Sequence, residues 1–542
     1  MSHAANAPAV PLLDAAAAGA GDERAVEAGD SWAGLMERAS GHLARGVLVA
    51  AGRGYGVRVA VLVGKGNNGG DGWGAARRLA DAGAQAWVVA PDGVEVEVSA
   101  ATAANRRRWM TGGGRTSAGT GDLGAALDWC DVAVDALLGT GVSGAPRGPA
   151  GDAAAALLRA REAGTRVVAC DVPSGVSADD GSAPDGAVRA DLTVTLGGMK
   201  RGLLLQPGAA HAGRVLVGDL GERYAPPGTG WWALTPAGAA PPPLEVDADK
   251  RARGVVLAVA GAEGTSGAAA LCGRGALAVG AGLVTVATPS TVRGEVAVHD
   301  PAMMVRGLPA DEYGAVHADG VGGLDALDGF DVVVAGPGLG HGPGALEVVA
   351  HLRRHAPRLV LDADALNVHR DDPGSLADHT GELVLTPHER ELARIGGGDD
   401  GPDAWAHRVE RVPELARRYD ATIVAKGPGT LVAAPDGRVW VCPMGGPALG
   451  AGGTGDVLAG MIAAAVASAD DVPLAVARAV WWHAAAGEAA GAGAAGRSGT
   501  DALLAQVPAT LAELGAVTTR ATSRPGVLPW DGWRTARGAG AR

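Results

Sequence analysis

The sequence predicts a two-domain α/β protein in which each domain has a mostly parallel sheet covered by helices on both faces. Short apolar segments of strand length alternate with Ala-, Leu- and Arg-rich segments of helical length in both halves of the chain. Such alternation is typical of βαβ units, whose strands are buried on both faces. A length of 542 residues suits two or three domains, and a proline-rich segment interrupts the alternation near the middle.

The expected elements set the domain boundaries. In the first half we expect strands at residues 57–63, 86–89, 131–137, 166–170, 192–196 and 214–217, with helices such as 74–82 and 152–162 between them. In the second half we expect strands at 255–260, 283–287, 331–335, 358–361, 382–385 and 422–425, then helices from 455 to about 468 and around 474–490. The predicted organisation is a first domain at 10–225, a proline-rich linker at 226–246, a second domain at 247–518 and a disordered tail at 519–542.

Composition argues against several classes of protein. A formal net charge of −13 argues against a nucleic-acid scaffold. The four cysteines (Cys130, Cys170, Cys272 and Cys442) form no CxxC pair, which argues against a zinc site or a disulfide framework and fits a reducing cytoplasm. The N-terminus lacks the basic region of a signal peptide. The uncharged run 275–292 contains three glycines and a proline, so we expect a helix end and a buried strand there instead of a membrane span.

Lysine is rare in this chain. Only four of the 46 basic residues are lysines: Lys65, Lys200, Lys250 and Lys426. Alanine, glycine and arginine dominate, as a GC-rich coding bias would produce. A lysine that persists under this bias suggests a position that a guanidinium cannot fill, because an ammonium is a compact point charge. All four lie in or beside glycine-rich segments, which chance explains poorly.

The most informative motif is the glycine-rich segment at residues 450–456 (GAGGTGD), which directly precedes an apolar run of helical type. Glycines let backbone N–H groups point toward one spot, and the start of a helix adds positive partial charge there. Such a place holds phosphate. Because a bound phosphate repels a neighbouring carboxylate, we interpret Asp456 as a base; the alternative is a glycine-rich turn with Asp456 as an ordinary N-cap.

Three strand ends in the first half carry related chemistry. The segments are 64–72 (GKGNNGGDG), 139–144 (GTGVSG) and 171–175 (DVPSG). The ends of parallel strands share one edge of a sheet, so we expect these loops to converge there with Asp135 and Asp171. The glycine turn predicts a phosphate or dinucleotide cradle, and the Asn and Asp oxygens could coordinate a hard cation.

These motifs resemble the YjeF N-terminal family, the epimerases of hydrated NAD(P)H, over about residues 10–220. The resemblance implies a Rossmann-like domain, a potassium ion held by Asn68, Asp135 and Ser174, and Asp171 as the catalytic acid/base. The residues that it implies as contacts of the hydrated nucleotide are Asn67, Asn68, Gly69, Gly70, Asp71, Gly139, Thr140, Gly141, Val142, Ser143, Gly144, Ala145 and Asp171.

Four strand ends in the second half also carry glycine, proline or polar residues. They are 336–340 (GPGLG), 362–367 (DADALN), 386–391 (TPHERE) and 426–430 (KGPGT). Lys426 can neutralise a phosphate, and Thr430 can hydrogen-bond to one. His388 is either a ligand contact or the cap of a helix, and taken alone it favours the cap.

With the segment 450–456, these motifs resemble the YjeF C-terminal family over about residues 248–515. That family has a ribokinase-like fold and comprises ADP- or ATP-dependent dehydratases of the same hydrated nucleotides. The resemblance implies that Asp456 frees the substrate hydroxyl to attack a terminal phosphate. It implies Ala268, Gly338, His388 and Asp456 as contacts of the hydrated nucleotide, and Lys426, Gly427, Pro428, Gly429, Thr430 and Gly455 as contacts of ADP.

Together the two resemblances imply a bifunctional repair enzyme for nicotinamide nucleotides. One domain would interconvert the R and S forms of NADHX and NADPHX. The other would dehydrate the S form to NAD(P)H while ADP is split into AMP and phosphate. The implied cofactors are K⁺ for the first domain and Mg²⁺ with ADP for the second, although no carboxylate pair for Mg²⁺ is evident. We also expect a cytoplasmic homo-oligomer without a nucleic-acid or membrane partner.

Some positions depart from the family patterns. Gly446 stands where Asn is usual, and Ser40 stands where the N-terminal helix usually has Gly. Gly450-Ala451 replaces Ala-Thr or Ala-Ser, Arg251 follows Lys250 in place of Gly, and Ala262 replaces Ser. The departures in the second half could weaken nucleotide binding, but they leave Asp456 and the glycine-rich segment intact.

Two other functions are compatible with the same motifs. A ribokinase-like fold with a Gly-Thr-Gly-Asp segment also serves small-molecule kinases, which would leave a stable phosphorylated product, and the first half would then be a non-catalytic nucleotide-binding domain. The first half could instead be a binding or scaffold module. Asp171 and the intact segment 64–72 argue against that second alternative.

Overall fold

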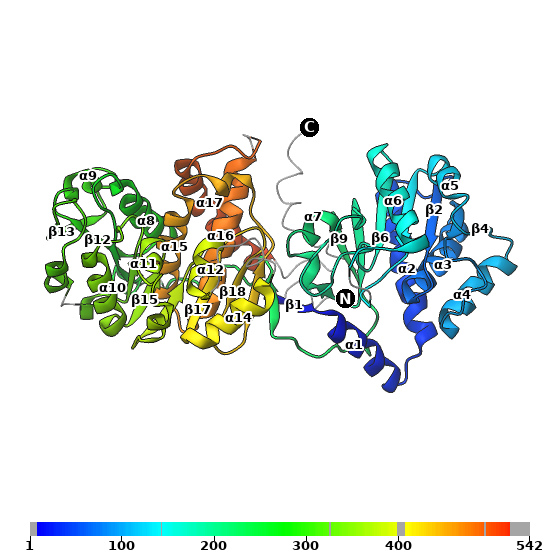
Figure 1. Cartoon of the computed structure of the whole chain (residues 1–542), viewed down its shortest axis with the longest axis horizontal. Helices are drawn as coiled ribbons and strands as arrows, with labels where there is room; N and C mark the ends of the chain where they lie inside the picture. Colours follow the sequence, from blue (N-terminus) through cyan, green and yellow to red (C-terminus); the bar gives the residue numbers. More distant parts are fainter. Residues whose placement is uncertain are drawn as a thin grey trace. The chain divides into compact units, whose positions relative to one another are not determined.

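The computed structural model describes residues 8–141, 144–245, 247–324, 327–397, 407–492 and 495–520 (Figure 1). Within them the chain forms two compact units. The first contains residues 11–231, and the second contains the described residues from 232 onward together with residues 8–10. Each unit is an α/β fold with a largely parallel sheet, which confirms the predicted fold class.

The first unit is built on a seven-stranded parallel sheet of order β4-β3-β2-β5-β6-β7-β9. The strands are β2 (Arg58–Val63), β3 (Gln85–Ala90), β4 (Arg115–Ala118), β5 (Val132–Ala136), β6 (Arg166–Cys170), β7 (Leu192–Leu196) and β9 (Arg214–Gly218). Along β2, Val59 and Val61 pack on one face of the sheet while Ala60 and Leu62 pack on the other. A strand buried on both faces needs such a continuous apolar run.

Helices cover both faces of this sheet. The core on one face includes α2, α3 and α4, and the core on the other includes α5 and α6 (Figure 1). The helices are α1 (Ala15–Glu27), α2 (Trp32–Ala51), α3 (Asn67–Asp81), α4 (Ala100–Thr111), α5 (Leu123–Trp129), α6 (Gly148–Glu162) and α7 (Gly208–Ala212). After β7 come the short strand β8 (Met199–Lys200) and the turn η1 (Arg201–Leu203), and β8 pairs in parallel with Leu12 and Leu13 of β1 (Ala9–Leu13).

The sheet of the second unit has the order β13-β12-β11-β14-β15-β16-β17-β18-β19, with β10 beside β19. It is parallel from β13 to β17, and β17, β18 and β19 are antiparallel. The strands are β10 (Trp231–Leu234), β11 (Val255–Val259), β12 (Leu283–Pro289), β13 (Met304–Leu308), β14 (Val332–Ala335), β15 (Arg358–Leu361), β16 (Glu382–Leu385), β17 (Ala421–Ala425), β18 (Thr430–Ala433) and β19 (Val439–Cys442).

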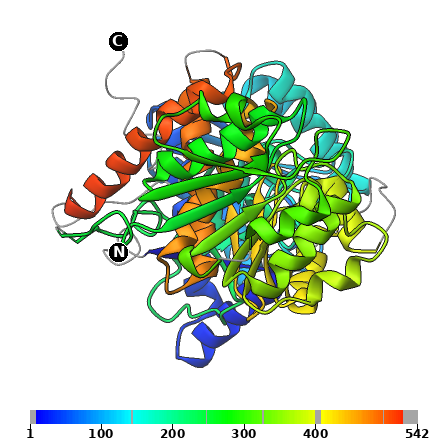
Figure 2. The ribbon, with the colours of Figure 1, turned by 90° about the vertical axis from the view of Figure 1, so that its left-hand side faces the viewer.

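Helices lie on both sides of this second sheet, as Figure 2 shows. The α-helices are α8 (Ser266–Val279), α9 (Arg293–Ala297), α10 (Pro343–His355), α11 (Asp364–Asn367), α12 (Glu389–Ile395), α14 (Arg408–Tyr419), α15 (Thr454–Ala467), α16 (Val472–Gly491) and α17 (Thr500–Arg520). The 3-10 helices are η2 (Ala318–Leu324), η3 (Leu327–Gly329), η4 (Pro373–Ala377) and η5 (Pro447–Gly450).

Close packing of α15 against α8 fixes the start of α15. A Cβ added at Gly460 would lie 1.9 Å from the carbonyl oxygen of Cys272, and one at Gly275 would lie 2.4 Å from that of Val457. Only glycine permits so close an approach of two helix backbones. Since α15 is apolar on nearly all sides, it is buried between helices and sheet, as its composition requires.

The expected strands agree with the observed ones to within two residues at either end. Seven observed strands were not expected: β1, β4, β8, β10, β13, β18 and β19. Residues 275–292 contain the end of α8 and then β12, as expected, and none of the helices in the described ranges is long and apolar enough to cross a membrane.

The described part of the segment predicted as a linker, 226–245, contains β10 and the fully buried Ala239, so some of its residues are packed. Of the predicted tail, residues 519–520 end α17, and residues 521–542 lie outside the described residues.

Candidate functional sites

Three loops of the first unit meet at the carboxyl edge of its sheet, because they follow the neighbouring strands β2, β5 and β6. A Cβ added at Gly175 would lie 2.8 Å from Cδ of Pro146, so the loops after β5 and β6 are in contact. A Cβ at Gly69 would lie 1.9 Å from the carbonyl oxygen of Gly64, so α3 can begin this close to β2 only with glycine at that position. The loops that the sequence predicted to converge therefore do so.

Asn68, Asp135 and Ser174 form one buried polar cluster at this edge. Ser174 donates its backbone N–H to Oδ2 of Asp135 over 2.8 Å and its hydroxyl to Oδ1 over 2.6 Å. The Asn68 amide donates to the carbonyl oxygens of Leu138 (2.9 Å) and Cys170 (2.8 Å). The Leu138 N–H donates to Oγ of Ser174 over 2.9 Å and closes the cluster. The three residues that the family resemblance assigns to potassium thus lie together.

The carboxyl group of Asp135 is buried without a basic partner in the described part of the chain. Burial raises its pKa, and hydrogen bonds from Ser174 and Leu137 act in the opposite direction. A buried anion is costly unless a cation or hydrogen bonds compensate it. The oxygens of Asn68, Ser174 and the nearby carbonyls are ligands that hard cations prefer. The set of oxygen donors therefore fits the predicted K⁺.

Asp171 lies directly after β6 with a φ of 63°, a conformation that non-glycine residues rarely adopt. Its Oδ1 accepts three hydrogen bonds, from Nζ of Lys200 (2.6 Å), the N–H of Leu196 (3.0 Å) and Oγ1 of Thr195 (3.2 Å). Lys200 is only 1% exposed and also donates to the carbonyl oxygen of Leu196. The three donors hold the carboxylate in one orientation through Oδ1, and none of these hydrogen bonds involves Oδ2.

Two further carboxyl groups lie close to this ion pair. Asp71, on α3, is buried; burial raises its pKa well above the usual range, and the charges of Asp171 and Asp22 raise it further. Burial also raises the pKa of Asp22, on α1, to about 6, while Lys200 acts to lower it. Sequence reasoning missed Asp22, because no motif marks it, and it treated Asp71 as a substrate contact or a possible cation ligand.

The other residues predicted to contact the hydrated nucleotide surround the same edge. Asn67 begins α3, and its Oδ1 accepts a hydrogen bond from Oγ of Ser99 over 2.9 Å. A Cβ at Gly139 would lie 3.0 Å from Oδ1 of Asn68. Gly70 lies on α3, and Thr140, Gly141, Gly144 and Ala145 lie in the loop after β5, whereas Val142 and Ser143 are outside the described residues.

In the second unit, α15 places Asp456 in its first turn, directly after the glycine-rich segment. Gly453 precedes the helix with a φ of 87°, and a side chain there would collide with Leu271. The free N–H groups of the first turn make this an anion-binding place. The pKa of Asp456 is raised to about 7, mainly by burial and also by the carboxylate of Asp362, while Lys426 acts to lower it. A carboxyl group that titrates near neutrality suits proton transfer.

Lys426 follows β17, and its ammonium group reaches the start of α15. Its Nζ lies 2.5 Å from Oδ1 of Asp362, and a Cβ added at Gly455 would lie 3.6 Å from Nζ. Burial would lower the pKa of Lys426, but the carboxylates of Asp362 and Glu391 more than offset this and raise it. A phosphate at the start of α15 would therefore meet both N–H groups and a permanent cation.

His388 lies beside Lys426 at the same edge of the sheet, where the Lys426 N–H donates to the carbonyl oxygen of Pro387 over 2.9 Å. It is the N-cap of α12: its Nδ1 accepts the N–H of Arg390 (3.1 Å), and Oε2 of Glu391 accepts the His388 N–H (2.8 Å). The ring is half exposed, and its Nε2 lies 3.1 Å from Oε1 of Glu391. The cap interpretation is thus correct, and the ring also borders the site.

Thr265 brings Ala268 and Gly338 together at the start of α8. Oγ1 of Thr265 donates to the carbonyl oxygen of Gly338 over 2.7 Å, and the Ala268 N–H donates to the carbonyl oxygen of Thr265 over 3.1 Å. The same helix borders the predicted base, because burial and the charge of Asp456 raise the pKa of Cys272 on α8. Ala268, in the first turn of α8, and Gly338, which Thr265 holds beside it, therefore lie on the α8 side of Asp456.

The predicted ADP-binding turn at 427–430 is closed by its own side chain. Oγ1 of Thr430 donates to the carbonyl oxygen of Gly427 over 2.8 Å and accepts the Gly427 N–H over 3.3 Å. Gly427 and Pro428 are exposed, and Gly429 has a φ of 72°. Thr430 thus shapes the turn, and its hydroxyl could donate to a phosphate only by giving up its hydrogen bond to Gly427.

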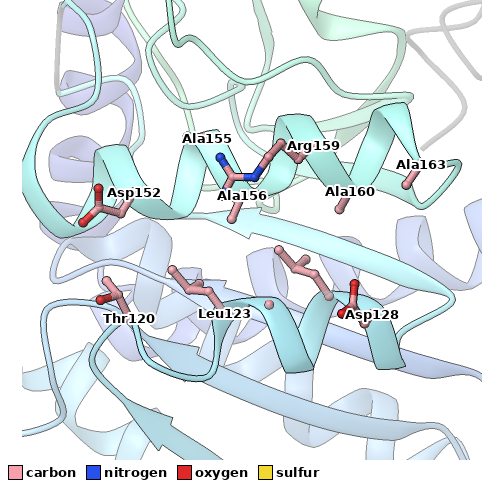
Figure 3. A pocket seen from close by; sticks show the side chains of 11 residues that line it. Thr120, Leu123, Asp128, Asp152, Ala155, Ala156, Arg159, Ala160 and Ala163 are labelled. Carbon is pink, nitrogen blue, oxygen red and sulfur yellow. The ribbon is translucent and has the colours of Figure 1, made fainter.

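A cavity of about 620 Å³ lies between α5 and α6 of the first unit (Figure 3). Its walls carry Leu123 and Asp128 from α5 and Asp152, Ala156 and Arg159 from α6. None of the residues predicted for either site lines it, so it is not assigned to the chemistry.

Comparison with known families identifies both halves of the chain. Residues 33–202 match the family model described as YjeF-related protein N-terminus, and residues 256–507 match the one described as NAD(P)H-hydrate dehydratase. The second match agrees with the ribokinase-like fold predicted for the second domain.

Individual relatives are similar over most of the chain. A bifunctional NAD(P)H-hydrate repair enzyme of Gloeobacter violaceus is 38% identical over 470 residues, which cover 84% of this chain and 88% of the relative. One of Moorella thermoacetica is 36% identical over 446 residues, which cover 80% and 83%. Among solved structures, an ADP/ATP-dependent NAD(P)H-hydrate dehydratase of Bacillus subtilis is 27% identical, with a TM-score of 0.44, and the match covers 52% of this chain and 97% of that one.

Proposed function

This chain belongs to the family of bifunctional NAD(P)H-hydrate repair enzymes, and from that premise we propose that it returns damaged nicotinamide nucleotides to use. The first unit interconverts the R and S forms of NADHX and NADPHX. The second unit dehydrates the S form to NAD(P)H and splits ADP into AMP and phosphate. The single observation that carries the proposal is the carboxyl group of Asp456, which titrates near neutrality beside an anion hole that also holds an ammonium group.

In the first unit, Asp171 is the acid/base of epimerisation. Its Oδ2 takes the proton of the hydroxyl at C6 while the C6–N1 bond opens and the electron pair moves to N1. The proton returns when the ring closes on the other face of C6. Lys200, Leu196 and Thr195 keep Oδ1 occupied, so the carboxylate stays aligned through both steps.

A potassium ion held by Asn68, Asp135 and Ser174 would neutralise the buried carboxylate of Asp135 and fix the loop ends beside the substrate. Together with the segments 67–71 and 139–145, these residues would shape the pocket for the hydrated nucleotide.

In the second unit, the reaction needs a base at the substrate hydroxyl and a place for phosphate charge. Asp456 accepts the hydroxyl proton as the oxygen attacks the terminal phosphorus of ADP, and AMP leaves. Loss of phosphate from C6 and of a proton from the neighbouring carbon then completes NAD(P)H. The N–H groups at Gly455 and the ammonium of Lys426 stabilise the phosphate charge in both steps.

Magnesium would enter this site with the nucleotide. Among the residues that the structure describes, no group of three or more His, Cys, Asp or Glu side chains could hold a metal ion by itself. Mg²⁺ is usually bound through one or two carboxylates plus substrate phosphates, so a preformed protein cage is not needed. We retain the prediction that ADP is the phosphate donor. We also retain the prediction of a cytoplasmic homo-oligomer, and light scattering on the purified protein tests the oligomeric state.

The reaction products test the proposal against the kinase alternative. The purified protein is incubated with NADHX, Mg²⁺ and K⁺, with ADP and ATP in parallel, and the products are separated by chromatography. We expect NADH, phosphate and, with ADP, AMP in equal amounts. A stable phosphorylated substrate without NADH would instead identify a kinase, and an Asp456→Asn variant with unchanged turnover would refute the assignment of the base.

A further inference from the structure

The carboxylate of Asp362 is a charged group that the proposed chemistry does not use. It follows β15, is 1% exposed, and lies 2.5 Å from Nζ of Lys426. Oγ1 of Thr386 donates to Oδ1 of Asp362 over 2.7 Å, and the Thr386 hydroxyl also lies 3.3 Å from the carbonyl oxygen of Leu361. A buried charge is retained only when such partners compensate it. The Lys426 ammonium and the Thr386 hydroxyl therefore compensate the buried carboxylate of Asp362.

The three side chains come from three adjacent strands of the sheet. Asp362 follows β15, Thr386 follows β16 and Lys426 follows β17, and these strands are neighbours in parallel register. The pair lies at the start of α15, because a Cβ at Gly455 would be 3.6 Å from the Lys426 ammonium. An ammonium group has three N–H donors, so contact with one carboxylate leaves donors for a phosphate.

We propose that Asp362 is a positioning residue for the dehydration, which holds the Lys426 ammonium beside the anion hole at the start of α15. The inference rests on the proposed function of the second unit. Because the charge of Asp362 also acts on Asp456, the side chain has two separable effects: one on phosphate binding through Lys426, and the other on proton transfer through Asp456.

The charges around Asp456 support the second effect. Asp362 and Asp364 raise the pKa of Asp456 and Lys426 lowers it. On the helices packed against α15, Cys272 of α8 has a pKa well above its usual value, and the pKa of His483 on α16 is lowered to about 4, so both are neutral near pH 7. Arg274 of α8 is occupied by an ion pair with Asp501 of α17 (2.9 Å). The charges that act on Asp456 therefore come from Asp362, Asp364 and Lys426.

The test is the variant Asp362→Asn, assayed for dehydration of the S form with ADP over a range of pH. Loss of a hydrogen bond to a charged group is expected to raise the KM for ADP about 10-fold. Loss of a nearby negative charge is expected to move the acidic limb of kcat/KM to lower pH by roughly one unit. A role in folding alone would lower the amount of active enzyme without moving either quantity.

The variant Asp364→Asn is the matched control. Asp364 also raises the pKa of Asp456, but its carboxylate accepts from the N–H of Gly340 (2.9 Å) and lies 3.0 Å from Nε2 of His341, away from Lys426. We expect its acidic limb to move in the same direction while the KM for ADP stays as in the unchanged protein. An Asp362→Asn variant with an unmoved limb and an unchanged KM would overturn the inference.

If Asp362→Asn does not fold, the variant Thr386→Val tests the effect of Asp362 on ADP binding through Lys426. It removes the hydroxyl that fixes Oδ1 of Asp362 and keeps the side-chain volume. Loss of this one hydrogen bond is expected to weaken ADP binding about threefold, and unchanged binding would contradict the proposed clamp. Calorimetry measures the affinity for ADP without turnover. A failure of the proposed function would instead appear as no turnover in the unchanged protein, so the two outcomes can be distinguished.

Discussion

At the scale of single residues, the first site depends on one strained aspartate and one buried lysine. Asp171 adopts a φ of 63°, which costs a non-glycine residue roughly 1–3 kcal/mol and persists only where the surroundings enforce it. Here the surroundings are the Lys200 ammonium, the Leu196 N–H and the Thr195 hydroxyl, which all meet Oδ1. The scarcity of lysine already marked position 200, and the structure supplies a reason: a compact ammonium fits this fully enclosed position.

Replacement of Lys200 by Met tests this arrangement. Without the ammonium, the Asp171 carboxylate loses its only charged donor among the described residues, so we expect epimerisation to slow by at least roughly 100-fold. Dehydration of the S form should be unaffected. Exchange between separated epimers, followed by chromatography, measures the effect. Lys250→Met, at an exposed lysine of the second unit, is the control and should change neither rate. Normal epimerisation by Lys200→Met would show that the ion pair is dispensable.

The second site makes a pH-dependent prediction. Burial raises the pKa of Asp456 to about 7, and a base acts only in its ionised form. Below that pH the ionised fraction falls, so kcat/KM for dehydration should drop about 10-fold per pH unit, while it should be flat above neutrality until another group titrates. A pH profile at constant ionic strength measures this limb. Full activity maintained to pH 5 would mean that Asp456 is not the base or is not buried during catalysis.

At the scale of elements, α2 contains an unsatisfied buried hydroxyl. Oγ of Ser40 is buried and has no hydrogen-bond partner among the residues that the structure describes, and α3 packs so closely that a Cβ at Gly74 would lie 2.1 Å from it. Ser40→Ala removes an uncompensated polar group and improves helix propensity, so we expect the free energy of unfolding to rise by about 1 kcal/mol. Urea denaturation followed by tryptophan fluorescence measures this change.

The control for Ser40→Ala lies in the same helix. Ser31 is the N-cap of α2, and its side chain accepts the N–H of Gly34 over 3.0 Å. Ser31→Ala should therefore lower the free energy of unfolding by about 1 kcal/mol. A loss of stability in both variants would mean that the Ser40 hydroxyl is bonded after all.

The loop before α15 allows a restoring substitution. Gly446 stands where the family usually has Asn, and a Cβ added there meets no atom within 4 Å. Its φ of −150° is extended backbone that any residue adopts. Gly446→Asn should therefore fold normally and, by adding one hydrogen-bonding side chain, lower the KM for ADP roughly threefold. Steady-state kinetics with varied ADP measures it. Gly446→Ala, which adds volume without a polar group, should leave the KM unchanged, and a gain by both would refute the hydrogen-bond explanation.

The strands and their loops were predictable because buried parallel strands are continuous apolar runs that end in glycine and polar residues. Strands β18 and β19 were missed because they are short antiparallel segments without a helix between them. The electrostatic effect of the Asp171–Lys200 pair on Asp22 was not predictable, because it depends on how α1 packs, which no local pattern encodes. Asp362 was visible in the segment DADALN, but its partner Lys426 comes from a different strand end, and only the sheet order brings the two together.

At the scale of the whole molecule, each unit has its own sheet and its own core, and the proton-transfer groups proposed for the two activities belong to different units. The proposed activities should therefore be separable by single substitutions. The dehydratase consumes one epimer, and the epimerase renews that epimer from the other, which gives a physical reason for both activities on one chain.

Complementation between two inactive variants tests the central claim most directly. A mixture of both NADHX epimers is incubated with ADP, Mg²⁺ and K⁺, and NADH is followed by its absorbance on a time scale shorter than spontaneous epimerisation. The unchanged protein should recover all of the NADH, Asp171→Ala only the fraction present as the S form, and Asp456→Asn none. An equal mixture of the two variants should recover all of it. Full recovery of NADH by Asp171→Ala alone would contradict the assignment of one activity to each unit. So would no recovery of NADH by the mixture, provided that both variants are correctly folded.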